Sequence, residues 1–199
     1  MFEHKYITQM KLDNKQKLRK FFLKSRKGLV GTEFRIKNEK TTKRLLNLEE
    51  VENRKNILIY LSVDKEVETD GIINGLLKKG ANIFVPFYSK KHKSWGLCKF
   101  QGWQELEEGP LGILQPKNPG ITSADIVDLA ILPGLAFSKG GVRLGYGKGV
   151  FDKLLSQSKA LKIGLAYDFQ VVEKLPREKH DLVMNIVVTE KRVIIVHSS

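Results

Sequence analysis

Cysteine is almost absent from this sequence, and its scarcity limits where and how the protein can work. The single cysteine, Cys98, excludes an internal disulfide and fits a reducing compartment, so we expect a cytoplasmic protein. Nothing around Cys98 indicates a lowered thiol pKa. We therefore interpret it as a small buried apolar side chain rather than a nucleophile.

Long apolar runs are also missing. None approaches the length of a membrane span, and the N-terminal stretch MFEHKYITQMK lacks the apolar centre of a secretory signal. The chain has 199 residues, of which 41% are hydrophobic and 29% charged, and this is enough to bury a core of its own. We expect one domain over residues 1–199, on which a basic helical segment (residues 1–55) packs, and no membrane partner.

Acidic residues are few relative to basic ones. The chain has 22 Asp and Glu against 35 Lys and Arg, a net charge of +13, and residues 1–55 hold 16 basic residues against 7 acidic ones. Three interpretations fit such a segment: lysines that cover solvated helix faces, binding of a polyanionic small molecule such as ATP or a polyglutamylated cofactor, and binding of a nucleic acid. We rank them in that order, because no aromatic interleaving or nucleic-acid motif accompanies the charge.

Strand-like and helix-like patterns alternate along the chain. Asp13 or Asn14 is expected to cap a helix over KQKLRKFFLKSRKGL, and a second helix is expected over residues 32–52. Apolar runs predict strands over residues 56–63, 81–88, 161–167, 186–188 and 193–196. A helix between the first two makes a βαβ unit, whereas residues 107–119 are rich in turn formers and should be irregular. We expect a three-layer, Rossmann-like α/β fold with a mostly parallel central sheet and helices on both faces.

A glycine-rich segment joins the apolar run DIVDLAILPG to the helix-like start VFDKLLSQ. Backbone N–H groups at a helix N-terminus, with no Cβ atoms in the way, favour a bound phosphate, and Arg143 and Lys148 add positive charge. A P-loop is excluded, because Lys148 is followed by Gly149 instead of Ser or Thr. A dinucleotide fingerprint is excluded too, because Val150 stands at the third glycine position.

The run RLGYGKGVFD, from Arg143 to Asp152, together with PGLAF at residues 133–137, resembles the hallmark of the 5-formyltetrahydrofolate cyclo-ligases, also called methenyltetrahydrofolate synthetases. Three residues depart from the usual pattern: Ser138 and Asn185 replace aspartates, and Val150 replaces an aromatic residue. Further matches are K-x-x-L-R at residues 15–19, EVET at 66–69, PLGILQP at 110–116 and PREKHD at 176–181. The resemblance covers most of the chain.

The resemblance implies an enzyme that converts 5-formyltetrahydrofolate and ATP to 5,10-methenyltetrahydrofolate, ADP and phosphate. It implies catalytic roles for Lys148 and Arg143 and places Mg²⁺ on Asp152 and Asp181. It places the pterin ring of the folate, with or without a polyglutamate tail, on the carboxylate of Glu66, and Tyr146 and Phe151 can stack on a ring. The ATP contacts that it implies are Lys15, Arg19, Arg143, Leu144, Gly145, Tyr146, Gly147, Lys148, Gly149, Val150 and Phe151.

Two other functions stay open at this point. A sugar-phosphate isomerase or a CoA-transferase-like enzyme of similar architecture would not require ATP. A basic RNA-binding module would use the N-terminal helix, and its affinity would fall steeply with salt. We expect a monomer and rank nucleic acid last among the partners.

Overall fold

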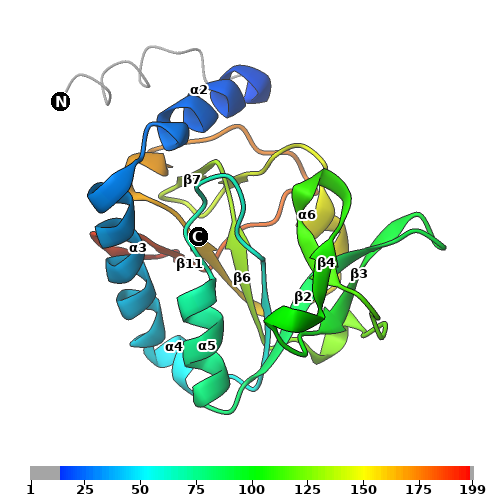
Figure 1. Cartoon of the computed structure of the whole chain (residues 1–199). Coiled ribbons are helices and arrows are strands. Elements are labelled where there is room, and N and C mark those ends of the chain that lie inside the picture. The colour runs from blue at the N-terminus through cyan, green and yellow to red at the C-terminus, as the bar shows by residue number, and fades with distance from the viewer. Residues whose placement is uncertain (1–13, 198–199) are drawn as a thin grey trace.

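The computed structural model describes residues 14–197, which form a central sheet with helices packed around it (Figure 1). The seven strands of this sheet lie in the order β12-β11-β9-β6-β1-β2-β3. The inner five pair in parallel, whereas β3 and β12 run antiparallel at the two edges. The strands are β1 (Asn56–Ile59), β2 (Asn82–Ser89), β3 (Ser94–Lys99), β6 (Leu129–Pro133), β9 (Leu161–Leu165), β11 (Ile186–Val188) and β12 (Val193–Ile195). The mostly parallel sheet predicted from the sequence is therefore confirmed.

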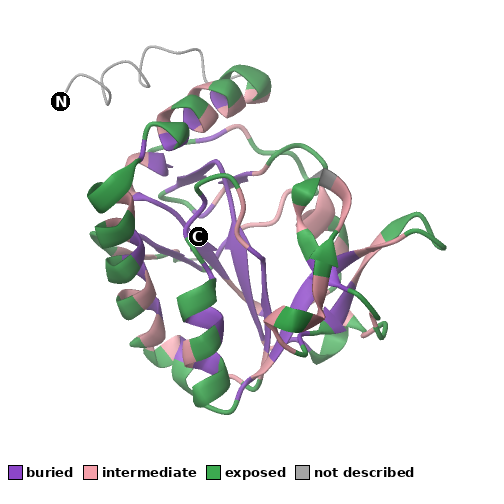
Figure 2. Ribbon diagram, in the orientation of Figure 1, coloured by how far each residue is buried: buried purple, intermediate pink, exposed green. Residues whose placement is uncertain are grey.

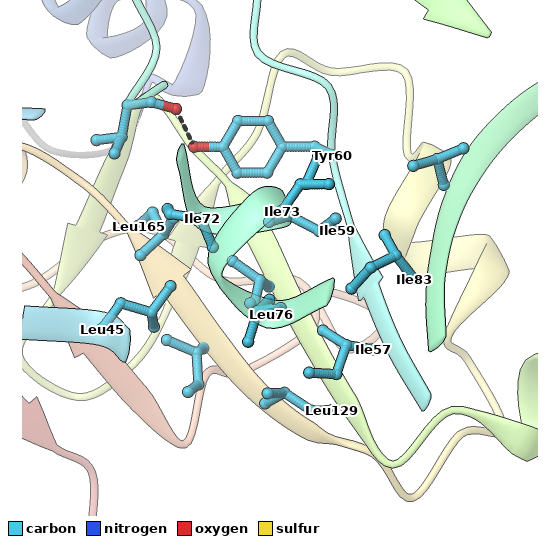
Figure 3. Packing of buried hydrophobic residues seen from close by; sticks show 14 of the residues in the cluster. Leu45, Ile57, Ile59, Tyr60, Ile72, Ile73, Leu76, Ile83, Leu129 and Leu165 are labelled. Carbon is cyan, nitrogen blue, oxygen red and sulfur yellow. Dashed lines mark hydrogen bonds between the residues drawn. The ribbon is translucent and has the colours of Figure 1, made fainter. Parts of the chain in front are cut away.

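Apolar side chains alternate between the two faces of the sheet, and each face is covered. Ile57 and Ile59 of β1 pack on one face with α3 (Gly31–Leu46) and α5 (Asp70–Lys78), as Figure 3 shows. Leu58 points to the other face, where α6 (Val150–Leu154) and the short helix η3 (Ala124–Ile126) pack. Burial is deepest in the strands between these layers (Figure 2). The three-layer arrangement follows from strands that are buried on both sides.

The basic helix α2 (Lys15–Lys27) packs on a second, smaller sheet. The side chain of Asn14 caps this helix by accepting hydrogen bonds from the backbone N–H groups of Gln16 and Lys17. Leu18 and Phe22 are buried in a cluster with residues of β7 (Ala136–Ser138), β8 (Arg143–Leu144) and β10 (Val171–Val172). In Figure 1, α2 crosses the top of the molecule above β7.

Three local predictions were wrong. The helix expected over residues 32–52 is broken into α3 and α4 (Glu49–Glu52), because Asn47 ends the first helix. The first strand ends at Ile59 rather than at residue 63, and just beyond it the hydroxyl of Tyr60 donates a hydrogen bond to the carbonyl of Val67. The segment expected to be irregular contains a two-stranded sheet, β4 (Leu106–Glu108) and β5 (Leu114–Pro116), whose Gln115 accepts from Tyr88 N–H of β2.

The remaining short elements are 3-10 helices, namely η1 (Trp103–Glu105), η2 (Pro110–Gly112) and η4 (Asp168–Gln170). Within residues 14–197, no helix is long and apolar enough to cross a membrane. Cys98 is buried in β3, and burial raises the pKa of its thiol to about 12, which leaves it unreactive at neutral pH.

Substituting Gly164 tests how tightly the sheet packs around Phe137. A Cβ atom on Gly164 of β9 would overlap the fully buried Phe137 ring, so we expect Gly164→Ala to lower the free energy of unfolding by about 1–3 kcal/mol. Gly71→Ala, in α5, is the matched control, because a Cβ at this position would lie at an ordinary 3.7 Å from Thr42 Cγ2 of α3. This control should be neutral or slightly stabilising in urea unfolding. A Gly164→Ala variant as stable as the wild type would contradict the packing.

Candidate functional site

A cavity of about 670 Å³ opens beyond the carboxyl ends of β1 and β6, where ligands gather in open α/β sheets. Every residue that the sequence assigned to a site lines it: Lys15, Arg19, Glu66, Arg143, Leu144, Gly145, Tyr146, Gly147, Lys148, Gly149, Val150, Phe151, Asp152 and Asp181. Its wall also includes Tyr60, Leu61, Val63, Asp64, Pro86, Trp95, Ile113, Pro133, Glu178 and His180. The structure therefore brings together segments that are more than 100 residues apart in the chain.

The glycine loop from Gly145 to Gly149 wraps around the guanidinium group of Arg19. Arg19 Nε donates to the carbonyl of Gly145 at 2.9 Å, and a Cβ on Gly147 would lie 3.2 Å from Arg19 Cζ. Gly147 also has a φ of +96°, which a residue with a side chain rarely adopts. Within residues 14–197, the backbone N–H groups of Gly147, Lys148 and Gly149 donate no hydrogen bond. The loop thus offers free donors to the cavity.

The helix after this loop is shorter than expected. α6 has five residues, so its dipole is small, and the attraction for an anion comes from the loop donors and the nearby cations. Lys148 is exposed on the loop and makes no ion pair with any residue that the structure describes. It is a cation that a ligand can reach without displacing a partner.

Arg143 and Asp152 form a nearly buried ion pair. Arg143 Nη2 lies 2.9 and 2.8 Å from the two carboxylate oxygens of Asp152, and Nη1 donates to the carbonyl of Pro133 at 3.3 Å. Asp152 Oδ1 also accepts from Leu182 N–H at 3.1 Å. The side chains are 6% and 17% exposed. Each charge therefore has a partner already, and a phosphate or a metal ion would have to share it.

Lys15 bridges two acidic residues near the C-terminal part of the chain. Its ammonium group lies 2.8 Å from Glu178 Oε1 and 2.7 Å from Asp181 Oδ2. Burial raises the pKa of Asp181, but hydrogen bonds from Glu178 N–H and Lys15 outweigh it, so the pKa lies below its usual value. Burial lowers the pKa of Lys15, and these two carboxylates more than restore it.

The same acids form a group that could hold a metal ion. One donor atom each of Glu178, His180 and Asp181 lies within 4.8 Å of the others. Asp152 is not part of this group. Sequence reasoning missed Glu178, although it stands three residues before the Asp181 that the family pattern singled out.

Glu66 is held at the cavity wall by a strained turn. Asp64 and Lys65 both have positive φ, 50° and 62°, and Glu66 N–H donates to the carbonyl of Val63 at 2.9 Å. The Glu66 carboxylate accepts from Val63 N–H through Oε2 and from the hydroxyl of Tyr146 through Oε1. Burial raises the pKa of Glu66, and these two hydrogen bonds oppose it.

The three departures from the family pattern lie in different places. Ser138 Oγ accepts from Val142 N–H inside the β7–β8 hairpin, and Asn185 Oδ1 accepts from Lys162 N–H beside β9. Val150, in contrast, lines the cavity.

The chain is similar to proteins of known activity along most of its length. The model of the 5-formyltetrahydrofolate cyclo-ligase family matches residues 11–190. A 5-formyltetrahydrofolate cyclo-ligase from Haemophilus influenzae is 31% identical over 179 residues, which cover 87% of this chain and 96% of that protein. The mouse enzyme of the same name is 30% identical over 182 residues, covering 84% of this chain and 90% of its own.

Solved structures are similar to this chain too. A 5,10-methenyltetrahydrofolate synthetase from Aquifex aeolicus is similar with a TM-score of 0.82 and 34% identity, covering 93% of this chain and 94% of that one. A synthetase of the same name from Mycoplasma pneumoniae has a TM-score of 0.72 at 23% identity, covering 89% of this chain and 99% of its own, and so shares the fold.

Removing one partner of the Arg143–Asp152 pair should be costly, because it leaves a buried guanidinium group without its anion. We expect Asp152→Ala to lower the free energy of unfolding by about 3 kcal/mol in urea titrations. Lys139→Ala is the control, since it breaks the exposed Lys139–Glu173 pair and should cost less than about 1 kcal/mol. Equal losses in the two variants would mean that Asp152 is not committed to Arg143 and is free for another ligand.

Proposed function

Because this chain belongs to the 5-formyltetrahydrofolate cyclo-ligase family, we propose that its cavity holds ATP and the folate side by side and aligns them for ring closure. The protein is a ligase, an enzyme that forms 5,10-methenyltetrahydrofolate from 5-formyltetrahydrofolate. The proposal rests on one observation: a buried carboxylate lines the same cavity as backbone donors and a cation that have no partner in the described part of the chain.

The chemistry explains why ATP is needed. A formamide carbonyl is a poor electrophile, and its oxygen is a poor leaving group. Transfer of the γ-phosphoryl group to that oxygen releases ADP and leaves an iminium-like carbon. N10 attacks this carbon and loses its proton, and phosphate departs with the formyl oxygen. The enzyme then has to align two substrates and neutralise phosphoryl charge, and it needs no side-chain nucleophile.

The phosphate end of ATP is assigned to the glycine loop. Gly147, Lys148 and Gly149 present N–H groups without partners in the described chain, and Lys148 adds an exposed positive charge. Arg19 lies against the same loop and keeps its two Nη groups for phosphate oxygens. Lys15 and Arg143 reach phosphates only by sharing their charge with the acids that they contact now.

The pterin end of the folate is assigned to Glu66, with Tyr146 and Phe151 beside it. A carboxylate can accept two parallel N–H bonds from an aminopyrimidine edge. Tyr146 donates to Glu66 Oε1 in this structure, so its hydroxyl gives way when the pterin binds. Tyr146 is 41% exposed, which leaves it room to turn outward.

We assign Mg²⁺ to Asp181, with Glu178 as a second oxygen donor, because hard cations beside nucleotide phosphates prefer carboxylate oxygens. Asp152, which the family pattern also suggests, would have to share its oxygens with Arg143. The bound ion would neutralise phosphate charge during transfer. Lys15 would then release Glu178 and Asp181 and contact phosphate oxygens instead. We further propose that the enzyme works as a cytoplasmic monomer.

The near-ultraviolet absorbance of the methenyl product tests this assignment. With 5-formyltetrahydrofolate we expect the absorbance to rise only when ATP and Mg²⁺ are both present, and to stop rising when EDTA is added. Product without ATP would overturn the ATP site. Unchanged turnover in EDTA would overturn the metal site. RNA binding that competes with the folate would favour the basic-module alternative.

Lys148→Ala tests the loop cation. Removing a charge that stabilises the transferring phosphoryl group should lower kcat about 100-fold. Lys159→Ala is the matched control, because Lys159 is also exposed but does not line the cavity. Turnover at the wild-type level in Lys148→Ala would remove this residue from the catalytic machinery.

A further inference from the structure

Arg26, on α2, is the most deeply buried charged residue in the described part of the chain, with 1% of its surface exposed. Its Nε, Nη1 and Nη2 atoms make no hydrogen bond with any residue that the structure describes. A buried guanidinium group without hydrogen bonds is costly, and an apolar side chain would fill the same space at lower cost. Packing alone therefore does not account for an arginine here.

Two residues of the candidate folate site surround this guanidinium group. Arg26 Nη1 lies 3.8 Å from Glu66 Oε1, and Arg26 Cζ lies 5.4 Å from the centre of the Tyr146 ring. The first distance is too long for a hydrogen bond, but two charges so close in a protein interior interact strongly. The second is within the range of a cation–π contact.

Helical spacing places Arg26 in line with the cations of the phosphate site. It follows Arg19 by seven residues, which is about two turns, and therefore lies on the same side of α2. Arg19 contacts the glycine loop, whereas Arg26 lies behind Glu66. One helix thus serves both ends of the cavity.

The other groups that face Glu66 are neutral or negative. Tyr146 and Val63 donate hydrogen bonds to its carboxylate, and the carboxylate of Asp64 repels it. Tyr60, buried nearby, stays protonated because burial, and then the charge of Glu66, raise the pKa of its phenol. Arg26 supplies the positive charge in this set, and it lowers the pKa of Glu66 against the effect of burial.

We propose that Arg26 is a positioning residue that keeps Glu66 ionised and directed at the pterin edge of the folate. An ionised carboxylate only accepts hydrogen bonds, whereas a protonated one would direct an O–H group at the donors of the substrate. When the Tyr146 hydroxyl leaves Oε1, the guanidinium group remains as the fixed charge behind it. The inference rests on the folate role proposed for Glu66.

The test compares Arg26→Met with Arg26→Lys. Methionine keeps much of the length and removes the charge, whereas lysine keeps the charge. In Arg26→Met we expect the KM for 5-formyltetrahydrofolate to rise about tenfold, because Glu66 loses the fixed positive charge that lies 3.8 Å from its carboxylate. The KM for ATP should stay near the wild-type value.

The pH profile adds a readout that a purely structural role would not move. Without the cation, Glu66 takes up its proton at a higher pH. The acidic limb of the kcat/KM profile for the folate should therefore move to higher pH in Arg26→Met. Arg26→Lys should restore most of the profile. Lys24→Met, on an exposed position of the same helix, is the control and should leave both the KM and the profile unchanged.

Glu66→Gln separates the two ways in which the inference can fail. If Glu66→Gln leaves the KM for the folate unchanged, the role of Glu66 itself is wrong. If Glu66→Gln raises this KM but Arg26→Met does not, the role of Arg26 is wrong. If Arg26→Met and Arg26→Lys had the same folate KM and the same pH profile, the role of Arg26 would be overturned too.

Should Arg26→Met fail to fold, the double variant Arg26→Met/Glu66→Gln removes both charges together. A folate KM equal to that of Glu66→Gln alone supports the inference, because Arg26 then acts through Glu66. A further rise contradicts it.

Discussion

The packing of α2 on the β7–β8 hairpin is the contact on which the site depends. Leu18 and Phe22 anchor the helix in a buried cluster that includes Leu144, the residue next to the glycine loop. Once the helix is anchored, its polar side can lie only along the cavity. From Lys15 to Arg26 it spans about 16 Å, enough to reach from the acids near the C-terminal end of the chain to the turn that holds Glu66. The apolar side of a basic helix therefore decides where its charges act.

Charges in the cavity wall are largely neutralised within the protein. Lys15 contacts Glu178 and Asp181, Arg143 contacts Asp152, and Arg26 lies against Glu66. Such pairs let the chain fold without leaving buried charges uncompensated. They also mean that ligand binding is an exchange of partners, so its electrostatic gain is smaller than the number of cations suggests. Lys148, exposed on the glycine loop, requires no such exchange, and it is for this reason that the transferring phosphoryl group is assigned to it.

Much of the fold could be predicted from the sequence, because buried parallel strands and covering helices leave clear apolar patterns. The end of β1 could not be predicted, since Tyr60, Leu61 and Val63 continue the apolar run although the strand ends at Ile59. The turn that follows was also hidden, because Asp64 and Lys65 adopt positive φ without being glycines. Strand β5 pairs with β4, and its Gln115 accepts a hydrogen bond from the Tyr88 N–H of β2; no local pattern reveals these contacts.

The candidate site, like the fold, could be predicted only in part. Motifs separated by long stretches of chain identified residues that the fold gathers around one cavity, because each motif follows a strand or begins a helix. Partners within the cavity could not be predicted: Arg143 and Asp152 stood in one motif as a phosphate ligand and a metal ligand, yet they contact each other. Arg26 had a visible signal, its seven-residue spacing from Arg19, but among the many cations of this helix nothing singled it out before its burial was known.

The departures from the family pattern can now be weighed by position. Ser138 caps a hairpin and Asn185 binds the backbone of a neighbouring strand, so both act on how the sheets are built. Val150 is the one of the three that lines the cavity, next to Phe151, and Trp95 lines the same cavity. An aliphatic side chain there offers less flat surface for a ring to stack on than an aromatic one. Any difference in ligand preference between this chain and its relatives that arises from these three positions therefore has to act through Val150.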